Sequence, residues 1–313
     1  MTRVLIIKPS SLGDIVHGLQ VLAAMREGRP DLHVTWVVRE IFAPLVEACA
    51  QVDRVIVFQR QRGWRGLLGL RRALRAERFD LVFDLQGLLR SGLMTRWARG
   101  GQKVGRADAR EGAGWFYDRA IAPPTGPGPH HAVAILAPFL AELGLPVALH
   151  GRVTWHRGAI DPAVAAAGGA VVMFPDSRRP EKNWTGFADL TETLLARDPA
   201  RRVVWAGSTA APDGDRFPAD RFSNLTARTA LADLPGLIEG AACVVSNDSG
   251  PMHLAAAMGK RVVAVFGPTD PRCFGPYPLA APTHRVVRAP GGDLKRLEAT
   301  AVADTVEAML LSG

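Results

Sequence analysis

The stretch CVVSNDSGPMHLAAAMGKRVVAVFG, residues 243–267, is typical of a strand, a turn, a helix and a second strand in succession. The apolar runs at its two ends predict buried strands, and the segment from Gly250 to Met258 predicts the helix between them. An Asp, a Ser, a Gly and a His fill the turn before that helix. Because the first amides of a helix lack partners and its dipole favours anions, the turn predicts a site for a phosphate-bearing ligand.

The same alternation of short apolar runs and helical patterns extends over the whole chain. In the first half, RVLIIK, HVTWVV, DRVIVF and FDLVFDL are each followed by a helical pattern, the first from about Ile15; in the second half, AVVMFP, RRVVWAG, CVVSN and RVVAVFG restart the series. This order predicts doubly wound parallel sheets. A Pro- and Gly-rich loop, residues 122–131, precedes a predicted helix over 132–145. We expect two domains, 1–158 and 159–313.

Positive charge is concentrated in the first half of the chain. Residues 1–157 contain 22 Lys and Arg against 13 Asp and Glu, whereas the rest contain 16 against 17. Much of the excess lies in residues 60–78, where a solvated helix face is one reading and a surface for an acidic partner or an anionic membrane is the other. Nucleic acid is not expected as a partner, because no aromatic residues are interleaved with the arginines as stacking platforms and no nucleic-acid-binding motif is present.

Cysteine usage and hydropathy indicate where the protein works. The three cysteines are far apart and form no C-x-x-C pair, which predicts a reducing compartment and therefore the cytoplasm. Only four consecutive apolar residues precede Lys8, too few for a signal peptide, and no later run approaches the ~18 that span a bilayer. We therefore expect a soluble or peripheral protein.

The motif KPSSLGDIVHGL, residues 8–19, follows the first predicted strand. It lacks the G-x-G-x-x-G turn of dinucleotide-binding proteins, which argues against a nicotinamide oxidoreductase. Asp14 stands where the next helix begins. It is either an ordinary helix N-cap or a carboxylate presented to a ligand.

Two motifs of the second half carry groups that bind phosphate. In FPDSRRPEKNWTGF, residues 174–187, the Ser177 hydroxyl and the Lys182 ammonium can bond a phosphate. Asp248, Ser249, Gly250 and His253 surround the helix start described above. The acidic pair Asp213 and Asp215 has a spacing that sometimes holds a divalent metal, but so short a motif in a Pro- and Gly-rich loop does not predict a metal site.

Taken together, the stretches RVLIIKPSSLGDIVHGL, FDLVFDLQGLLRSG, KNW and VVSNDSGPMHLAAAMGKRVVAVFGPTDP resemble glycosyltransferase family 9, the ADP-heptose:lipopolysaccharide heptosyltransferases. They occur in the family's order over nearly the full length. The resemblance implies an α/β GT-B fold, in which two Rossmann-like, doubly wound parallel-sheet domains face each other across a cleft. It places the acceptor on the first domain and the nucleotide sugar on the second.

The resemblance also implies roles for individual residues. Asp14 stands at the position of the general base. The positions that bind the donor diphosphate and its sugar are Ser177, Arg178, Lys182, Asp248, Ser249, Gly250 and His253. The implied reaction is the inverting, metal-independent transfer of heptose from ADP-heptose to an acidic lipopolysaccharide core or lipid A precursor, through Kdo or heptose, at the cytoplasmic face of the inner membrane. No cofactor is expected.

At two places the chain departs from the family pattern. The segment His131-Ala-Val is followed by Ala134 and Ile135, where heptosyltransferase I members usually carry an acidic residue and an arginine. Ala211 stands where an acidic nucleotide contact is expected, with Asp213 nearby. A family member that uses another nucleotide sugar or acceptor therefore remains an alternative. So does a non-catalytic sugar-nucleotide-binding protein, which would not need Asp14.

Overall fold

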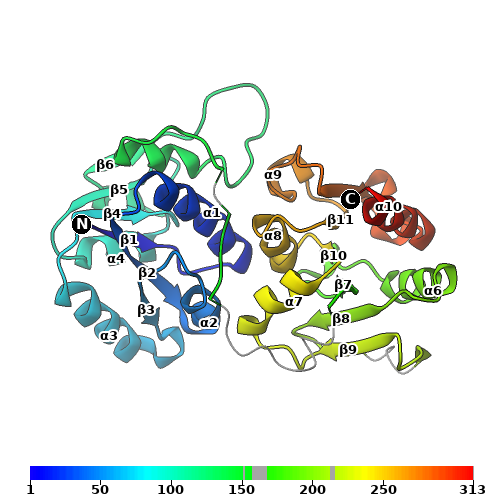
Figure 1. Cartoon of the computed structure of the whole chain (residues 1–313). Helices are drawn as coiled ribbons and strands as arrows, with labels where there is room; N and C mark the ends of the chain where they lie inside the picture. Colours follow the sequence, from blue (N-terminus) through cyan, green and yellow to red (C-terminus); the bar gives the residue numbers. More distant parts are fainter. Residues whose placement is uncertain (151, 157–167, 212–215, 313) are drawn as a thin grey trace. The chain divides into compact units, whose positions relative to one another are not determined.

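The computed structural model describes residues 1–150, 152–156, 168–211 and 216–312. The chain divides into two compact units, Met1–His156 and Arg157–Gly313, each built around a six-stranded parallel sheet (Figure 1). The sequence placed this division after residue 158. All three cysteines carry free thiols. Among the described residues, no helix is both long and apolar enough to cross a bilayer.

The sheet of the first unit has the strand order β3-β2-β1-β4-β5-β6. Its strands are β1 (Thr2–Ile7), β2 (Leu32–Arg39), β3 (Arg54–Phe58), β4 (Leu81–Asp84), β5 (Gln102–Arg106) and β6 (Arg119–Ile121). Ile6 of the central β1 pairs in register with Trp36 of β2 on one side and Phe83 of β4 on the other. The chain adds strands in one direction up to β3 and then returns to place β4 beside β1. The strand order therefore reverses between β1 and β4.

Helices cover both faces of this sheet, as right-handed crossovers between parallel strands require. They are α1 (Leu12–Gly28), α2 (Ala43–Glu47), α3 (Gly63–Ala76) and α4 (Leu89–Trp97), with the 3-10 helices η1 (Glu40–Phe42), η2 (Arg60–Arg62), η3 (Ala113–Phe116) and η4 (Ala137–Leu143). Leu70 and Leu74 of α3 and Met94 of α4 share one core cluster with Leu5 and Val82 of the sheet. Every residue of α1 from Ile15 to Met25 is buried.

The sheet of the second unit repeats the same topology in the order β12-β11-β10-β7-β8-β9. Its strands are β7 (Val171–Phe174), β8 (Val203–Gly207), β9 (Phe222–Thr226), β10 (Cys243–Asn247), β11 (Val262–Phe266) and β12 (His284–Arg288). Every residue of β7, β10 and β11 is buried, because layers of helix cover both faces of a parallel sheet. Here the strand order reverses between β10 and β7.

The helices of the second unit close its core from both sides. They are α6 (Phe187–Arg197), α7 (Leu234–Gly240), α8 (Gly250–Ala257), α9 (Pro271–Phe274) and α10 (Ala299–Leu311), with the 3-10 helices η5 (Pro180–Lys182), η7 (Leu231–Asp233), η8 (Pro290–Gly292) and η9 (Leu294–Arg296). Leu190 and Leu194 of α6 and Val302 and Val306 of α10 lie in one buried cluster with Trp205 of β8. α6 and α10 therefore lie side by side on one face of the sheet (Figure 1).

Two predicted helices differ from the observed ones. α1 begins at Leu12 rather than near Ile15, and Ser11 is its N-cap, so the reading of Asp14 as the N-cap is wrong. The predicted helix over 132–145 contains the 3-10 helix η4, in which the Phe139 amide bonds the Leu136 carbonyl three residues back. Pro138 lacks an amide donor in the first turn of η4, which weakens any α-helical pattern there.

Candidate active site

The candidate site of the first unit lies at the carboxyl ends of β1 and β4. Ligands of doubly wound sheets bind where the strand order reverses, because the loops after the two strands diverge there and leave a crevice. In this sheet the order reverses between β1 and β4. The motif of residues 8–19 follows β1 directly and leads into α1, so it places Asp14 at this edge.

Asp14 is fixed at the beginning of α1. Its Oδ2 atom accepts hydrogen bonds from the Ser11 backbone N–H at 3.0 Å and from the Ser11 hydroxyl at 2.6 Å. The helix dipole favours a negative charge at this end. The Asp14 side chain is nevertheless 44% exposed. A carboxylate that is held in place and still reaches solvent has the properties of a general base.

Lys8 is the buried counter-ion of Asp14. It follows β1 directly, and its side chain is only 2% exposed. Its Nζ donates a hydrogen bond to the Leu85 carbonyl at 3.0 Å and lies 3.6 Å from Asp14 Oδ1. Burial lowers the pKa of Lys8, and the charge of Asp14 opposes that shift. The sequence did not single out Lys8, because one lysine after a strand carries no recognisable pattern.

A second polar group at the same edge was also missed. Asp84, the last residue of β4, is fully buried, and its Oδ2 accepts a hydrogen bond from the Tyr117 hydroxyl at 2.7 Å. Burial raises the pKa of Asp84, and the bond from Tyr117 opposes the rise. Arg106, the last residue of β5, pairs with Asp108 at 2.6 Å, which raises the pKa of the guanidinium. The only sequence signal was an Asp at the end of a buried strand.

The candidate site of the second unit lies at its own reversal point, between β10 and β7. Lys182, in η5 after β7, donates a hydrogen bond to Asp248 Oδ2 at 2.5 Å, and the Thr269 hydroxyl donates to the same oxygen at 2.7 Å. Lys182 Nζ also lies 5.8 Å from the centre of the Phe274 ring. Two stretches singled out in the sequence thus meet at one point: Lys182 comes from residues 174–187, and Asp248 and Thr269 come from residues 244–271.

The first turn of α8 has no side-chain cap from Ser249 among the described residues. Ser249 is the N-cap residue, and its hydroxyl lies 3.1 Å from Ser246 Oγ. Gly250 begins the helix without a side chain, and His253 is buried one turn further on. The backbone amides of the first turn of a helix point outward along its axis and bind phosphate. The Asp248 carboxylate does not cap α8, since it accepts bonds from Lys182 and Thr269.

Ser177 and Arg178 belong to the loop between β7 and η5. Ser177 Oγ accepts a hydrogen bond from the Arg179 amide at 3.3 Å, and Arg178 is exposed. The preceding Asp176, which the sequence did not predict, accepts bonds at 3.0 Å from the Thr209 amide and from the Ser208 hydroxyl. Asp176 therefore anchors this loop to the one that follows β8.

Gly207, the last residue of β8, makes this anchoring possible. Its φ is +154°, and a Cβ atom there would lie 2.4 Å from the carboxylate of Asp176. No side chain fits so close an approach.

Metal ligation is not predicted by the described geometry. No group of three or more His, Cys, Asp or Glu side chains suited to a metal ion occurs within residues 1–150, 152–156, 168–211 and 216–312. The acidic pair Asp213 and Asp215 lies outside the described residues. Ala211 is tied to β9, because its amide donates to Thr226 Oγ1 at 3.0 Å and its carbonyl accepts from Asn224 at 2.9 Å.

Comparison with known proteins assigns the family. The model of glycosyltransferase family 9 (heptosyltransferase) matches residues 67–303, so the chain belongs to this family of glycosyltransferases. Lipopolysaccharide heptosyltransferase 1 of Escherichia coli O18:K1:H7 is 31% identical over 97% of this chain and 97% of its own length.

Solved structures agree with this assignment. E. coli heptosyltransferase WaaC with ADP has a TM-score of 0.81 and 30% identity, covering 98% of this chain and 100% of WaaC. WaaC with ADP-2-deoxy-2-fluoro heptose has a TM-score of 0.77 and 29% identity, covering 98% and 99%. The two six-stranded parallel sheets with flanking helices are therefore those of the GT-B fold, as the sequence predicted.

Proposed function

We propose that this enzyme transfers heptose from ADP-heptose to an acidic lipopolysaccharide inner-core acceptor, through Kdo or heptose, with inversion at the anomeric carbon. The observation that carries the proposal is the pairing of Lys182 with Asp248 beside the open N-terminus of α8, a site built for a diphosphate. Its support from relatives is the likeness to lipopolysaccharide heptosyltransferase 1 and to WaaC with ADP.

On the donor side, the protein must stabilise the negative charge of the departing ADP. When the bond between heptose and ADP breaks, negative charge develops on the diphosphate oxygens. The Lys182 ammonium and the first amides of α8 stabilise that charge where it forms, and they are already oriented before the reaction begins. Ser177, Arg178, Asp248, Ser249, Gly250 and His253 line the loops that would hold the donor. The positive charge at this end comes from the protein, so the proposed step uses no metal ion.

The acceptor half assigns the proton transfer to Asp14. Its carboxylate takes the proton of the acceptor hydroxyl as that oxygen attacks the anomeric carbon from the face opposite ADP. Ser11 holds the carboxylate by two hydrogen bonds. Lys8, 3.6 Å from Asp14 Oδ1, favours the charged form of the carboxylate that a base requires. Attack from the face opposite the leaving group gives single displacement with inversion.

The enzyme is proposed to work as a peripheral protein at the cytoplasmic face of the inner membrane, where its acceptor would be anchored. The surplus of positive charge in residues 1–157 supports this location, because inner-core sugars and lipid A carry carboxylates and phosphates. Nucleic acid is not a proposed partner.

A donor panel tests the proposed function. ADP-heptose, ADP-glucose, UDP-glucose and GDP-mannose would each be assayed for thermal stabilisation and for turnover with a lipopolysaccharide core acceptor. A true donor present at 100 times its Kd adds about 2.7 kcal/mol of stability. We expect only ADP-heptose to give both stabilisation and transfer. Stabilisation by ADP-heptose without any transfer would favour a binding protein, and transfer from another sugar would favour a different family 9 specificity.

A further inference from the structure

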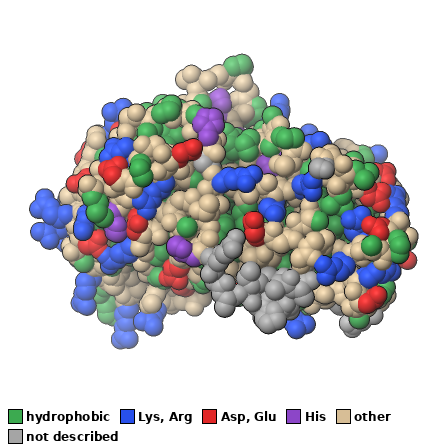
Figure 2. Space-filling model, viewed as in Figure 1, with side chains coloured by type: hydrophobic (Ala, Val, Ile, Leu, Met, Phe, Trp, Pro, Cys, Tyr) green, Lys and Arg blue, Asp and Glu red, His purple; other side chains and the backbone are tan. Residues whose placement is uncertain are grey.

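The outer surface of η2 and α3 concentrates positive charge without compensation. We call this surface the α3 face; it consists of Arg60, Arg62, Trp64, Arg65, Leu68, Arg71, Arg72 and Arg75. All six arginines are exposed, and residues 60–76 contain no Asp or Glu. No ion pair joins any of these six to a carboxylate among the described residues. Figure 2 shows Lys and Arg side chains gathered over the position of α3, at the lower left of the view.

Two large apolar side chains lie among these arginines. Trp64 is 67% exposed and Leu68 is 52% exposed, one helical turn apart. At 100° per residue they share the outer side of α3 with Arg71, Arg72 and Arg75, whereas Leu70 and Leu74 point into the core. An exposed tryptophan and leucine on a helix whose inner side is already packed have no role in the core of the first unit.

Arginines at the N-terminal end of α3 do not help this helix to fold. Arg60 and Arg62 precede α3, Arg65 lies in its first turn, and neither η2 nor that turn contains an acidic residue. The one carboxylate described beside them, Glu40, accepts bonds from the backbone amides of Arg60 and Gln61 at 3.1 Å. Cations at this end of a helix oppose its dipole. Residues that work against local stability are expected at functional positions.

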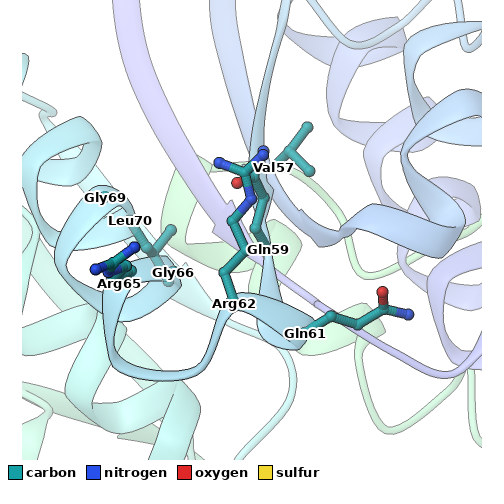
Figure 3. Close-up of a pocket in the computed structure, with 8 residues that line it drawn as sticks. All are labelled: Val57, Gln59, Gln61, Arg62, Arg65, Gly66, Gly69 and Leu70. Carbon is teal, nitrogen blue, oxygen red and sulfur yellow. The ribbon is translucent and has the colours of Figure 1, made fainter.

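The first turn of α3 packs closely against the backbone that follows β3. A Cβ atom at Gly66 would lie 2.0 Å from the Gln59 carbonyl oxygen, so the first turn of α3 is pressed against the end of β3. Beside this contact is a hollow of about 660 Å³, lined in part by Arg62, Arg65 and Gln59 (Figure 3). Arginine and glutamine side chains at its rim can bond a polar headgroup, and Val57 and Leu70 complete its lining.

We propose that the α3 face is the surface by which this enzyme docks onto an anionic phospholipid bilayer. Trp64 and Leu68 enter the headgroup region, and the surrounding arginines contact lipid phosphates. Basic amphipathic helices with Trp and Leu on one side bind membranes in this way. The inference rests on the peripheral membrane location proposed above and names the surface responsible. A nucleic acid is the less fitting occupant, because α3 offers a single aromatic platform.

Vesicle binding by the full-length enzyme, without donor or acceptor, tests the proposal. Sedimentation with phosphatidylcholine vesicles would be compared with vesicles in which roughly a third of the lipid is phosphatidylglycerol. We expect binding to the anionic vesicles only, weakening as salt is added. Equal binding to both kinds of vesicle, or to neither, overturns the proposal.

Charge-matched variants locate the surface. R71Q/R72Q/R75Q removes three positive charges from the α3 face, and R228Q/K295Q/R296Q removes three from exposed positions of the second unit. Each basic residue near an anionic surface strengthens binding roughly fivefold, so the first triple should weaken vesicle binding on the order of 100-fold. The second triple should bind as the unmodified enzyme does. Equal losses in the two triples would mean that net charge, and not the α3 face, drives binding.

Two further measurements test the roles of Trp64 and Leu68 and the alternative that the α3 face binds DNA. W64S/L68S should retain the salt-sensitive attraction and lose the binding that persists at high salt; if both survive, the insertion of these side chains is wrong. A duplex DNA oligonucleotide is measured in parallel, and an α3 triple that loses DNA binding while keeping vesicle binding overturns the proposal. Circular dichroism and Tm confirm that each variant is folded.

A second readout separates this inference from the proposed function. Heptose transfer to a water-soluble core acceptor without acyl chains should be unchanged in W64S/L68S, because that substrate needs no membrane. If the unmodified enzyme transfers no heptose but still binds anionic vesicles through the α3 face, the proposed reaction fails and the docking surface stands. If transfer is normal and α3-dependent vesicle binding is absent, the docking surface fails and the proposed reaction stands.

Discussion

The two units place the same kind of ion pair at the same point of the same topology, yet they expose opposite charges. In the first unit the lysine is buried and the carboxylate is accessible: Lys8 is 2% exposed and Asp14 is 44% exposed. In the second unit the lysine is the more accessible partner, since Lys182 is 14% exposed and Asp248 is 5% exposed. One scaffold therefore offers an anion to an acceptor hydroxyl and the other a cation to a diphosphate.

The difference follows from where the buried partner lies. Lys8 comes directly after β1 and Asp248 directly after β10, so in each unit the buried partner is the first residue beyond a central strand. The more exposed partners lie elsewhere: Asp14 is in the first turn of α1, and Lys182 is in η5 after β7. The sign of the charge that each site presents is therefore opposite to that of the residue buried beside the strand.

The largest expected effect is that of Asp14→Asn. It removes the proposed proton acceptor but keeps an oxygen that can accept the bonds from Ser11. We expect turnover to fall by roughly 10²- to 10⁴-fold with donor affinity nearly intact. Steady-state kinetics and calorimetric titration with ADP measure the two quantities. Ser11→Ala is the control, since it loosens the carboxylate without removing it and should cost far less. Unchanged turnover in Asp14→Asn would exclude Asp14 as the base.

Lys182→Ala should weaken the binding of ADP, whereas Asp14→Asn slows turnover. A charge-assisted hydrogen bond contributes about 1.5–3 kcal/mol, so ADP affinity should fall roughly 10- to 150-fold. The variant should also have a lower Tm, because the buried Asp248 carboxylate loses the Lys182 cation and, among the described residues, keeps the Thr269 hydroxyl as its side-chain partner. Lys295→Ala, an exposed lysine of the same unit, should change neither quantity. ADP affinity that matches the unmodified enzyme would contradict the diphosphate assignment.

Lys8→Met separates charge from packing in the first unit. Methionine fills a similar volume and removes a buried ammonium whose pKa burial lowers. Removing a poorly solvated charge favours the folded state, but the buried Leu85 carbonyl loses its hydrogen-bond donor, so the two effects oppose each other and Tm should change little. Turnover should fall about tenfold to a hundredfold, with its pH profile displaced, because Asp14 loses the cation that favours its charged form. A fall in Tm with a normal pH profile would assign Lys8 a structural role only.

The smallest effect concerns the pH dependence of stability through Asp84. Its folded-state pKa is raised by burial, so the folded protein holds this proton to higher pH than the unfolded chain does. Stability therefore falls as pH rises from the unfolded value of about 3.9 through the folded pKa. Asp84→Asn removes the buried charge and should raise Tm by about 2–4 °C at neutral pH. The gain should vanish as pH falls and Asp84 is protonated; a gain independent of pH would contradict the assignment.

The sequence was sufficient for the central strands because burial on both faces leaves a continuous apolar run. β1, β7, β10 and β11 were all predicted on this signal. Of the four edge strands, β3 keeps an apolar run and was predicted, but β6, β9 and β12 were not. An edge is covered on fewer sides and tolerates polar residues: β12 reads HRVVR, with four of its five residues at least partly exposed. The neighbouring β5, QKVGR, is similarly polar.

The residues of the candidate sites also fall into two groups, those that the sequence predicted and those that it missed. Asp14, Lys182 and Asp248 belong to motifs whose residues are close together in the sequence, so they were predicted. Asp84 and Tyr117 meet across 33 residues, and neither belongs to a local pattern with a chemical meaning of its own. Their contact is created only when β4, β5 and β6 align, which no short stretch of sequence encodes.

The helix α10 has a consequence for synthesis on the ribosome. Val302, Ala303, Val306 and Met309 of α10 supply part of the core that covers the second sheet. The first unit draws its core from residues that emerge early, and it can close while translation continues. Although α6 packs on the same face, the second sheet keeps part of that apolar face uncovered until α10 has left the exit tunnel. Apolar surface exposed in this way makes a nascent chain prone to aggregation.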